Sequence, residues 1–185
     1  MNGVLRVPAS DVFDDYAAAL ERGWSPDNLR PQVAQEQLTA IKADPQAFLS
    51  RMDDREAKGP PVTLPDGSQV PRLPSLRRWI WQDGFCGSIG LRWQPGKDAL
   101  PPTCLGHFGY AVVPWRRRRG LATKALIEML PIARRIGLRR VDPTASAGND
   151  ASIGVIEKAG GKYIQTFVTP AALGAAGDVL YRIDL

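Results

Sequence analysis

The sequence predicts an α/β fold, a β-sheet flanked by helices, and three observations carry this prediction. Residues 106–136 have the pattern of a buried strand, a short basic turn and an amphipathic helix. Residues 77–92 have the pattern of two strands joined by a tight turn at Asp83-Gly84. The expected order along the chain is β-α-α-β-β-β-α-β-α-β-β, so strands and helices are interspersed rather than segregated.

The N-terminal third is expected to hold one short strand and two helices, with a break or a new helix start at Pro45. The strand falls at residues 5–7, and the first helix runs over about 10–22, where a glycine follows it. Pro31 suits the first turn of a second helix. Pro45 indicates a break in this helix or a new helix start, with Asp44 as the N-cap.

The middle of the chain is expected to be a loop followed by three strands. Residues 53–65 are polar and rich in proline, which is typical of a mobile loop, and a turn is expected at Asp66-Gly67. The strands at 77–81 and 85–92 form a hairpin, and a long loop at 93–103 leads to the strand before the basic turn.

The C-terminal part adds three strands and a helix. Residues 139–145 are expected to form a strand that Pro143 interrupts, and Asn149 is a good N-cap for the helix that follows. Strands at 162–169 and 179–184 are joined by a loop rich in Ala and Gly. No internal repeat and no domain-sized linker is seen, so 1–185 is expected to be one domain.

Composition places the chain among soluble globular proteins. Hydrophobic residues make up 44% and charged residues 23% of the chain. The longest apolar runs are too short to span a bilayer, and the first residues do not have the pattern of a signal peptide, so we expect a cytoplasmic protein. Cys86 and Cys104 do not have metal-ligand spacing, so neither a metal site nor a disulfide is expected.

The turn between the strand and the long helix is the candidate functional segment. Backbone N–H groups at a helix N-terminus are unsatisfied and carry partial positive charge, so such a turn can bind a phosphate. Arginines at 116–119 add charge to this turn, and the chain has a formal net charge of +5. The alternative is that these arginines form a solvated or nucleic-acid-binding patch.

This turn resembles the acyl-CoA-binding motif of the GCN5-related N-acetyltransferases (GNAT), Gln/Arg-x-x-Gly-x-Gly/Ala. Arg117, Gly120 and Ala122 occupy the motif in register. Asn149 and Ser152 match a second motif of the family, Asn-x-x-Ala/Ser followed by a helix. Within the family, the chain resembles a group of uncharacterised bacterial predicted acetyltransferases. Two ordered motifs are more specific than either alone.

The resemblance implies a fold and a cofactor site. The fold is a single mixed central sheet with helices on both faces, in which the fourth and fifth strands splay apart around acetyl-CoA. The main chain of Tyr110 and Val112 is expected to contact pantetheine, and backbone N–H groups from Arg117 to Thr123 are expected to bind pyrophosphate. The expected cofactor-binding residues are Tyr110, Val112, Val113, Arg117, Arg118, Arg119, Gly120, Leu121, Ala122, Thr123, Asn149, Ser152 and Ile156.

The resemblance also implies acetyl transfer from acetyl-CoA to a primary amine, without a metal. The Val112 N–H is the expected oxyanion donor. Ile156 stands where many relatives place a tyrosine acid, so water, Tyr163 or an unassisted thiolate takes that role. His107 is the only histidine, and it is either the base or a hydrogen-bonded anchor for the 93–103 loop.

The acceptor is left open between a small amine, an amino acid, an antibiotic and a protein amino group. The alternative function is a non-catalytic module of the same fold that senses acyl-CoA or binds nucleic acid. Membrane and nucleic acid are not expected partners, and a homodimer is left open.

Overall fold

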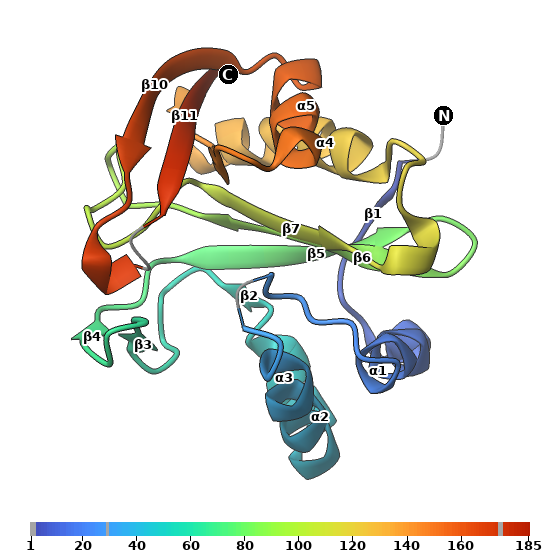
Figure 1. Ribbon diagram of the computed structural model, residues 1–185. Coiled ribbons are helices and arrows are strands. Elements are labelled where there is room, and N and C mark those ends of the chain that lie inside the picture. Colours follow the sequence, from blue (N-terminus) through green and yellow to red (C-terminus); the bar gives the residue numbers. More distant parts are fainter. Residues whose placement is uncertain (1–2, 29, 174–175) are drawn as a thin grey trace.

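Helices lie on both faces of a β-sheet in the computed structural model of the chain, which describes residues 3–28, 30–173 and 176–185 (Figure 1). Helices α4 and α5 lie on one face, and α1, α2 and α3 lie on the other. The helices are α1 (Phe13–Glu21), α2 (Val33–Ala43), α3 (Pro45–Ser50), α4 (Leu121–Ile136) and α5 (Asp150–Lys158), with 3₁₀ turns at Ser10–Val12, Pro114–Arg116 and Ala171–Leu173. The strands are β1 (Leu5–Arg6), β2 (Asp53–Asp54), β3 (Val62–Thr63), β4 (Gln69–Val70), β5 (Ser75–Trp81), β6 (Phe85–Arg92), β7 (Phe108–Val112), β8 (Arg140–Val141), β9 (Thr144–Ser146), β10 (Lys162–Val168) and β11 (Gly177–Asp184).

The strands form two main sheets. The larger has the order β1-β5-β6-β7, with β2 beside β5, and the smaller has the order β10-β11-β8, with β9 beside β11. All pairings between the described strands are antiparallel. The predicted α/β fold class is confirmed. The sheet divides between β7 and the β8–β9 segment, as the splayed strands of the family resemblance implied, but the described pairings are antiparallel rather than mixed.

The two sheets meet at one point, next to the start of β7. The N–H of His107 donates to the carbonyl of Asp142 at 3.2 Å. Gly106 precedes it with a φ of +69°, and a Cβ there would lie 2.8 Å from Oγ1 of Thr144. Only glycine adopts this conformation at so close an approach without strain. Beyond this junction β7 has no strand partner on its outer side among the described residues, which leaves a gap between the sheets.

The predicted helix ends are largely those of the structure. Asp44 caps α3 by accepting a hydrogen bond from the N–H of Ala47 at 2.9 Å. Asn149 caps α5 in the same way through the N–H of Ser152 at 3.1 Å. Helix α4 has the predicted bounds and ends at Gly137, whose φ is 102°.

The loop predicted at 53–65 contains two short strands, and that prediction is wrong at these positions. Asp53 and Asp54 form β2 and pair with β5, and β3 pairs with β4 around the predicted turn at Asp66-Gly67. Two-residue strands carry no hydrophobic periodicity from which a sequence could reveal them. Five positions used in the predictions lie outside the described residues, namely Met1, Asn2, Leu29, Gly174 and Ala175.

Each face of the larger sheet covers its own hydrophobic core. On the α4 face, Ile80 and Ile89 of the sheet lie in one buried cluster with Met129 of α4. On the other face, Tyr16 of α1 stacks on Trp79 with ring centroids 4.8 Å apart. No helix among the described residues is both long and apolar enough to cross a membrane.

Candidate functional site

The main-chain groups of β7 point in two directions, and half of them face the gap between the sheets. Arg92 donates to the carbonyl of His107, and Val113 donates to the carbonyl of Cys86. Pairing with the adjacent strand alternates along an antiparallel strand. The backbone groups of Tyr110 and Val112 therefore point away from β6, toward the gap.

Two side chains donate hydrogen bonds to the carbonyl groups on this side of β7. Asn28, in the connection between α1 and α2, donates from Nδ2 to the carbonyl of Tyr110 at 3.0 Å. Arg117 donates from Nε to the carbonyl of Val112 at 3.1 Å. The N–H groups of Tyr110 and Val112 remain as the donors that face the gap. No sequence pattern pointed to Asn28, because its partner lies 82 residues away along the chain.

The turn after β7 presents a run of open backbone donors. Arg118 and Gly120 have φ values of 63° and 71°, both in the left-handed region. No side chain caps α4, and its first hydrogen bond to the turn runs from Lys124 to the carbonyl of Gly120. Within the described residues, the N–H groups of 118–123 therefore have no hydrogen-bond acceptor. A Cβ on Gly120 would have no atom within 4 Å, so the space above these donors is open.

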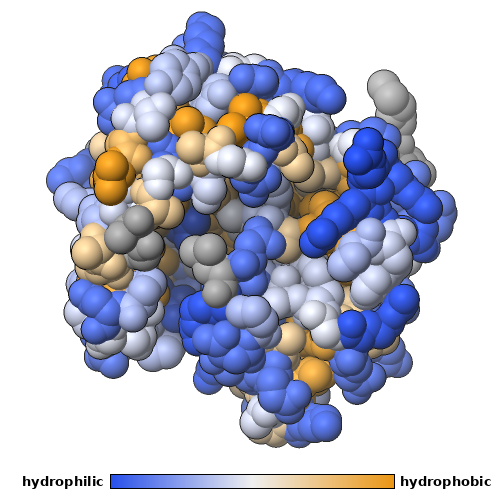
Figure 2. Space-filling model, in the orientation of Figure 1, coloured by the Kyte–Doolittle hydropathy of each residue, from blue (hydrophilic) through white to orange (hydrophobic). Residues whose placement is uncertain are grey.

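The four arginines of the turn have different surroundings. Arg116 donates to the carbonyl of Asp83 at 2.8 Å, and Arg117 binds Val112 as described above. Arg118 and Arg119 are exposed, and no side-chain partner is found for either among the described residues. Figure 2 shows strongly hydrophilic side chains gathered where Figure 1 places the turn between β7 and α4. A helix N-terminus, open N–H groups and two exposed guanidinium groups are features that favour the binding of an anion.

Helix α5 borders the gap opposite β7, and Tyr110 bridges the two. The Tyr110 hydroxyl donates to the carbonyl of Ser152 at 3.2 Å. Burial raises the pKa of this phenol, so it keeps its proton at neutral pH. Nδ2 of Asn149 has no partner among the described residues, while its Oδ1 caps the helix.

Two of the predicted cofactor contacts do not reach the gap in this structure. Ile156 is fully buried in the core beneath α4 and α5, so a contact with a ligand would require α5 to move. Val113 is also fully buried, on the face that α1 covers, and its N–H pairs with Cys86. A one-residue step along a strand reverses the face, which explains why Val112 and Val113 differ.

His107 lies at the junction of the sheets with only 1% of its surface exposed. Its Nδ1 accepts a hydrogen bond from the N–H of Asp142 at 2.9 Å, so the proton of the neutral ring is on Nε2. Burial lowers the pKa of His107, and the backbone and charge of Asp142 oppose that effect. The only lone pair of the neutral ring is thus already used, which favours an anchoring role over a base.

Tyr163 and Glu128 are both held by contacts within the fold. Tyr163 is 57% exposed on β10, where its hydroxyl contacts Oγ1 of Thr166. Glu128 on α4 accepts hydrogen bonds from the N–H groups of Val4 and Leu5 at 2.9–3.0 Å, a contact that the sequence did not predict. No cluster of three or more His, Cys, Asp or Glu residues able to hold a metal occurs in the part of the chain that the structure describes.

Comparisons with known proteins agree with this geometry. Residues 73–162 match the family model described as Acetyltransferase (GNAT) domain. A search of the curated proteins finds no match. Among solved structures, the chain is similar to the microcin C7 self-immunity acetyltransferase MccE in complex with acetyl-CoA and AMP, with 12% identity, a TM-score of 0.62, and 98% of this chain and 91% of that one covered.

Two structures that contain coenzyme A or its disulfide are also similar. RimL in complex with coenzyme A has 12% identity and a TM-score of 0.63, with 98% of this chain and 93% of that one covered. RimJ from Mycobacterium smegmatis in complex with a CoA disulfide has 16% identity and a TM-score of 0.59, with 97% and 80% covered. At these identities the likeness shows the fold.

Proposed function

Because this chain belongs to the GNAT family and is an acetyltransferase that uses acetyl-CoA, we propose that it acetylates a primary amine of a small molecule or protein at the gap between its two sheets. The observation that carries this proposal is the run of open N–H groups at 118–123, which follows shortly after the open N–H groups of Tyr110 and Val112 on β7. One ligand with phosphates at one end and an acyl group at the other would satisfy both.

In this proposal the pyrophosphate lies on the turn. Several N–H groups at one helix N-terminus can bind both phosphates, and the positive end of α4 favours their charge. Arg118 and Arg119, which have no other side-chain partner in the described structure, would contact the phosphate on the nucleotide. Asn149 would donate from its free Nδ2 to the pantetheine arm.

The thioester lies beside Val112. Attack of a neutral amine on the thioester carbon forms a tetrahedral intermediate whose oxygen carries negative charge, and the Val112 N–H is placed to donate to it. The amine loses one proton, and the departing thiolate gains one, so the overall reaction is balanced. Water takes the first proton, since His107 is buried with its lone pair in use.

The Tyr110 hydroxyl is the proton donor that we assign to the thiolate. It lies on the α5 side of β7 and reaches across the gap to Ser152. Tyr163, the other tyrosine considered, lies on β10 and is hydrogen-bonded to Thr166 there. A phenol that stays protonated at neutral pH can act as a general acid.

A coupled assay tests the acetyl-transfer proposal. Free thiol is measured as acetyl-CoA is consumed in the presence of three acceptor sets: small amines, peptides with a free α-amine, and peptides whose only amine is a lysine side chain. We expect thiol release above the acceptor-free rate in one of these sets, with a mass increase on the acceptor's amine. Acetyl-CoA that binds but never supports thiol release above that rate in any set would contradict the proposal.

The structural neighbours suggest which acceptor sets should be tested first. RimL is named as a ribosomal L7/L12 α-N-protein acetyltransferase. MccE is a self-immunity acetyltransferase, which is a different acceptor class. Peptides with a free α-amine therefore stand beside small amines in the first round.

A further inference from the structure

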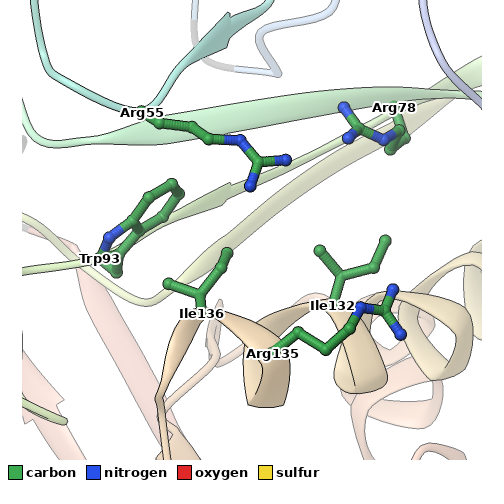
Figure 3. Close-up of a pocket in the computed structure, with 6 residues that line it drawn as sticks. All are labelled: Arg55, Arg78, Trp93, Ile132, Arg135 and Ile136. Carbon is green, nitrogen blue, oxygen red and sulfur yellow. The ribbon is translucent and has the colours of Figure 1, made fainter.

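A cavity lies between β5 and the C-terminal half of α4. Its volume is about 420 Å³. Figure 3 shows the guanidinium groups of Arg55 and Arg78 pointing toward one another on the sheet side, with Arg135 on the helix side. The residues that line it are Arg55, Arg78, Trp93, Ile132, Arg135 and Ile136.

Arg78 is a buried charge on an otherwise apolar face. It lies between Leu76 and Ile80, which alternate with it on β5 and belong to the core under α4. Only 8% of Arg78 is exposed. It donates to the carbonyl of Arg77 at 2.7 Å and to Asp53 at 3.2 Å. A guanidinium has five N–H donors, so three of them lack a partner among the described residues.

One carboxylate serves two of the three arginines. Asp53 lies 2.7 Å from Nε of Arg55 and 3.2 Å from Nη2 of Arg78. Burial by itself raises the pKa of Asp53, but the hydrogen bonds and charges of Arg55 and Arg78 outweigh it and lower that pKa. Arg135 forms no ion pair within the described structure. The cavity therefore holds a surplus of two positive charges.

This surplus distinguishes the cavity from a structural ion pair. Arg78 is the buried member and shares Asp53 with Arg55, whereas Arg55 and Arg135 are exposed at the mouth of the cavity. A buried arginine is normally matched by acceptors, and one shared carboxylate does not match the charge of all three. Three guanidinium groups around one hollow match the several oxygens of a phosphate. Trp93, Ile132 and Ile136 give the same hollow an apolar wall.

The cavity is separate from the proposed acetyl-CoA site. Arg135 lies in the last turn of α4, and the phosphate-binding turn precedes its first residue. A helix rises 1.5 Å per residue, so the two sites are about 20 Å apart along the axis.

We propose that this cavity binds a phosphate monoester, with its phosphate among Arg55, Arg78 and Arg135 and its organic part against Trp93, Ile132 and Ile136. The site is a second ligand site, and it stands whether or not the acetyl acceptor proposed above is correct. A bound phosphate dianion would neutralise the two positive charges of the arginines that Asp53 does not balance.

The test uses phenyl phosphate and inorganic phosphate as probes, titrated by calorimetry into the full chain. Coenzyme A is kept saturating throughout, so that the α4 turn is occupied. Arg135→Gln removes one lining charge at an exposed position, and Arg134→Gln, which removes the same charge at the neighbouring exposed position outside the cavity, is the matched control. Arg55→Gln is a second lining variant.

We expect phenyl phosphate to bind the wild-type chain, and Arg135→Gln and Arg55→Gln to weaken it at least about tenfold. Arg134→Gln should bind as the wild type does. Phenyl phosphate should bind more tightly than inorganic phosphate because of the apolar wall. The proposal is overturned if phenyl phosphate does not bind the wild type at millimolar concentration, if Arg134→Gln and Arg135→Gln weaken it equally, or if both probes bind equally.

Discussion

His107 connects the two sheets through its main chain and its side chain. Its N–H donates to Asp142, and its Nδ1 accepts from the same residue. Such a pair of bonds requires the neutral ring, because a protonated ring has no lone pair to accept with. His107 was the candidate base because its ordinary pKa is near neutral. In the structure, protonation of its ring would break a hydrogen bond that joins the two sheets.

The His107→Gln variant tests this role through pH. Burial holds the pKa of His107 below its usual value of about 6.5, so the unfolded chain takes up a proton at a higher pH than the folded chain. This contribution to stability is complete above about pH 6.5 and is lost as pH falls through the folded pKa. In His107→Gln, the free energy of unfolding should be lower at pH 7 and should fall less steeply toward pH 5 than in the wild type.

Urea unfolding at a series of pH values measures this difference. A variant whose stability falls in parallel with that of the wild type, together with a changed pH–rate profile and at least about tenfold lower turnover, would assign His107 to catalysis.

Tyr110 carries the other prediction at the residue scale. Tyr110→Phe keeps the ring on β7 and removes the hydroxyl that reaches Ser152. If the phenol protonates the leaving thiolate, turnover should fall at least about tenfold while acetyl-CoA affinity changes by less than about threefold. Steady-state kinetics and calorimetry separate these two quantities. An unchanged turnover would leave protonation of the thiolate to water.

At the scale of elements, α4 organises much of the molecule. Its first residue follows the turn proposed to bind pyrophosphate, its middle packs on the larger sheet, and its last turns line the arginine cavity. Glu128 also joins it to the N-terminal strand by accepting from the N–H groups of Val4 and Leu5. The helix therefore couples segments that are more than 120 residues apart.

Glu128→Ala tests the contact between α4 and β1. Loss of the carboxylate leaves the N–H of Val4, which is 6% exposed, without its acceptor. We expect a loss of about 1–3 kcal/mol in the free energy of unfolding. Glu56→Ala is the control, because Glu56 pairs with Lys58 at the exposed surface and its removal should leave stability unchanged. Equal stability of Glu128→Ala and the wild type would show that the contact contributes nothing.

The elements differ in how far the sequence predicted them. The bounds of α4 follow from helical periodicity and from Gly137, which are local signals. The turn after β7 was predicted from the types of its own residues, which is also a local signal. The contact of Asn28 with β7 and the cavity around Arg78 depend on tertiary approach, which no local pattern records. The division of the sheet was predicted only through the family resemblance.

At the scale of the whole molecule, the two sheets meet at one end and part beyond it. The junction at His107 holds them together, and the open N–H groups of β7 line the side where they separate. The net charge of +5 is concentrated in part at the turn that leads from this gap into α4. This arrangement is the basis for the proposal that acetyl-CoA binds along the gap with its phosphates at the turn.

The most direct measurement is a calorimetric titration of acetyl-CoA into the wild type, Gly120→Glu and Gly137→Glu. Both glycines have positive φ, neither has an atom within 4 Å of an added Cβ, and they flank the two ends of α4, so the variants match in strain and charge. Gly120→Glu places a carboxylate among the N–H groups proposed for pyrophosphate, and we expect at least about a hundredfold loss of affinity. Gly137→Glu should bind acetyl-CoA as the wild type does. Unchanged affinity in a folded Gly120→Glu protein would contradict the account.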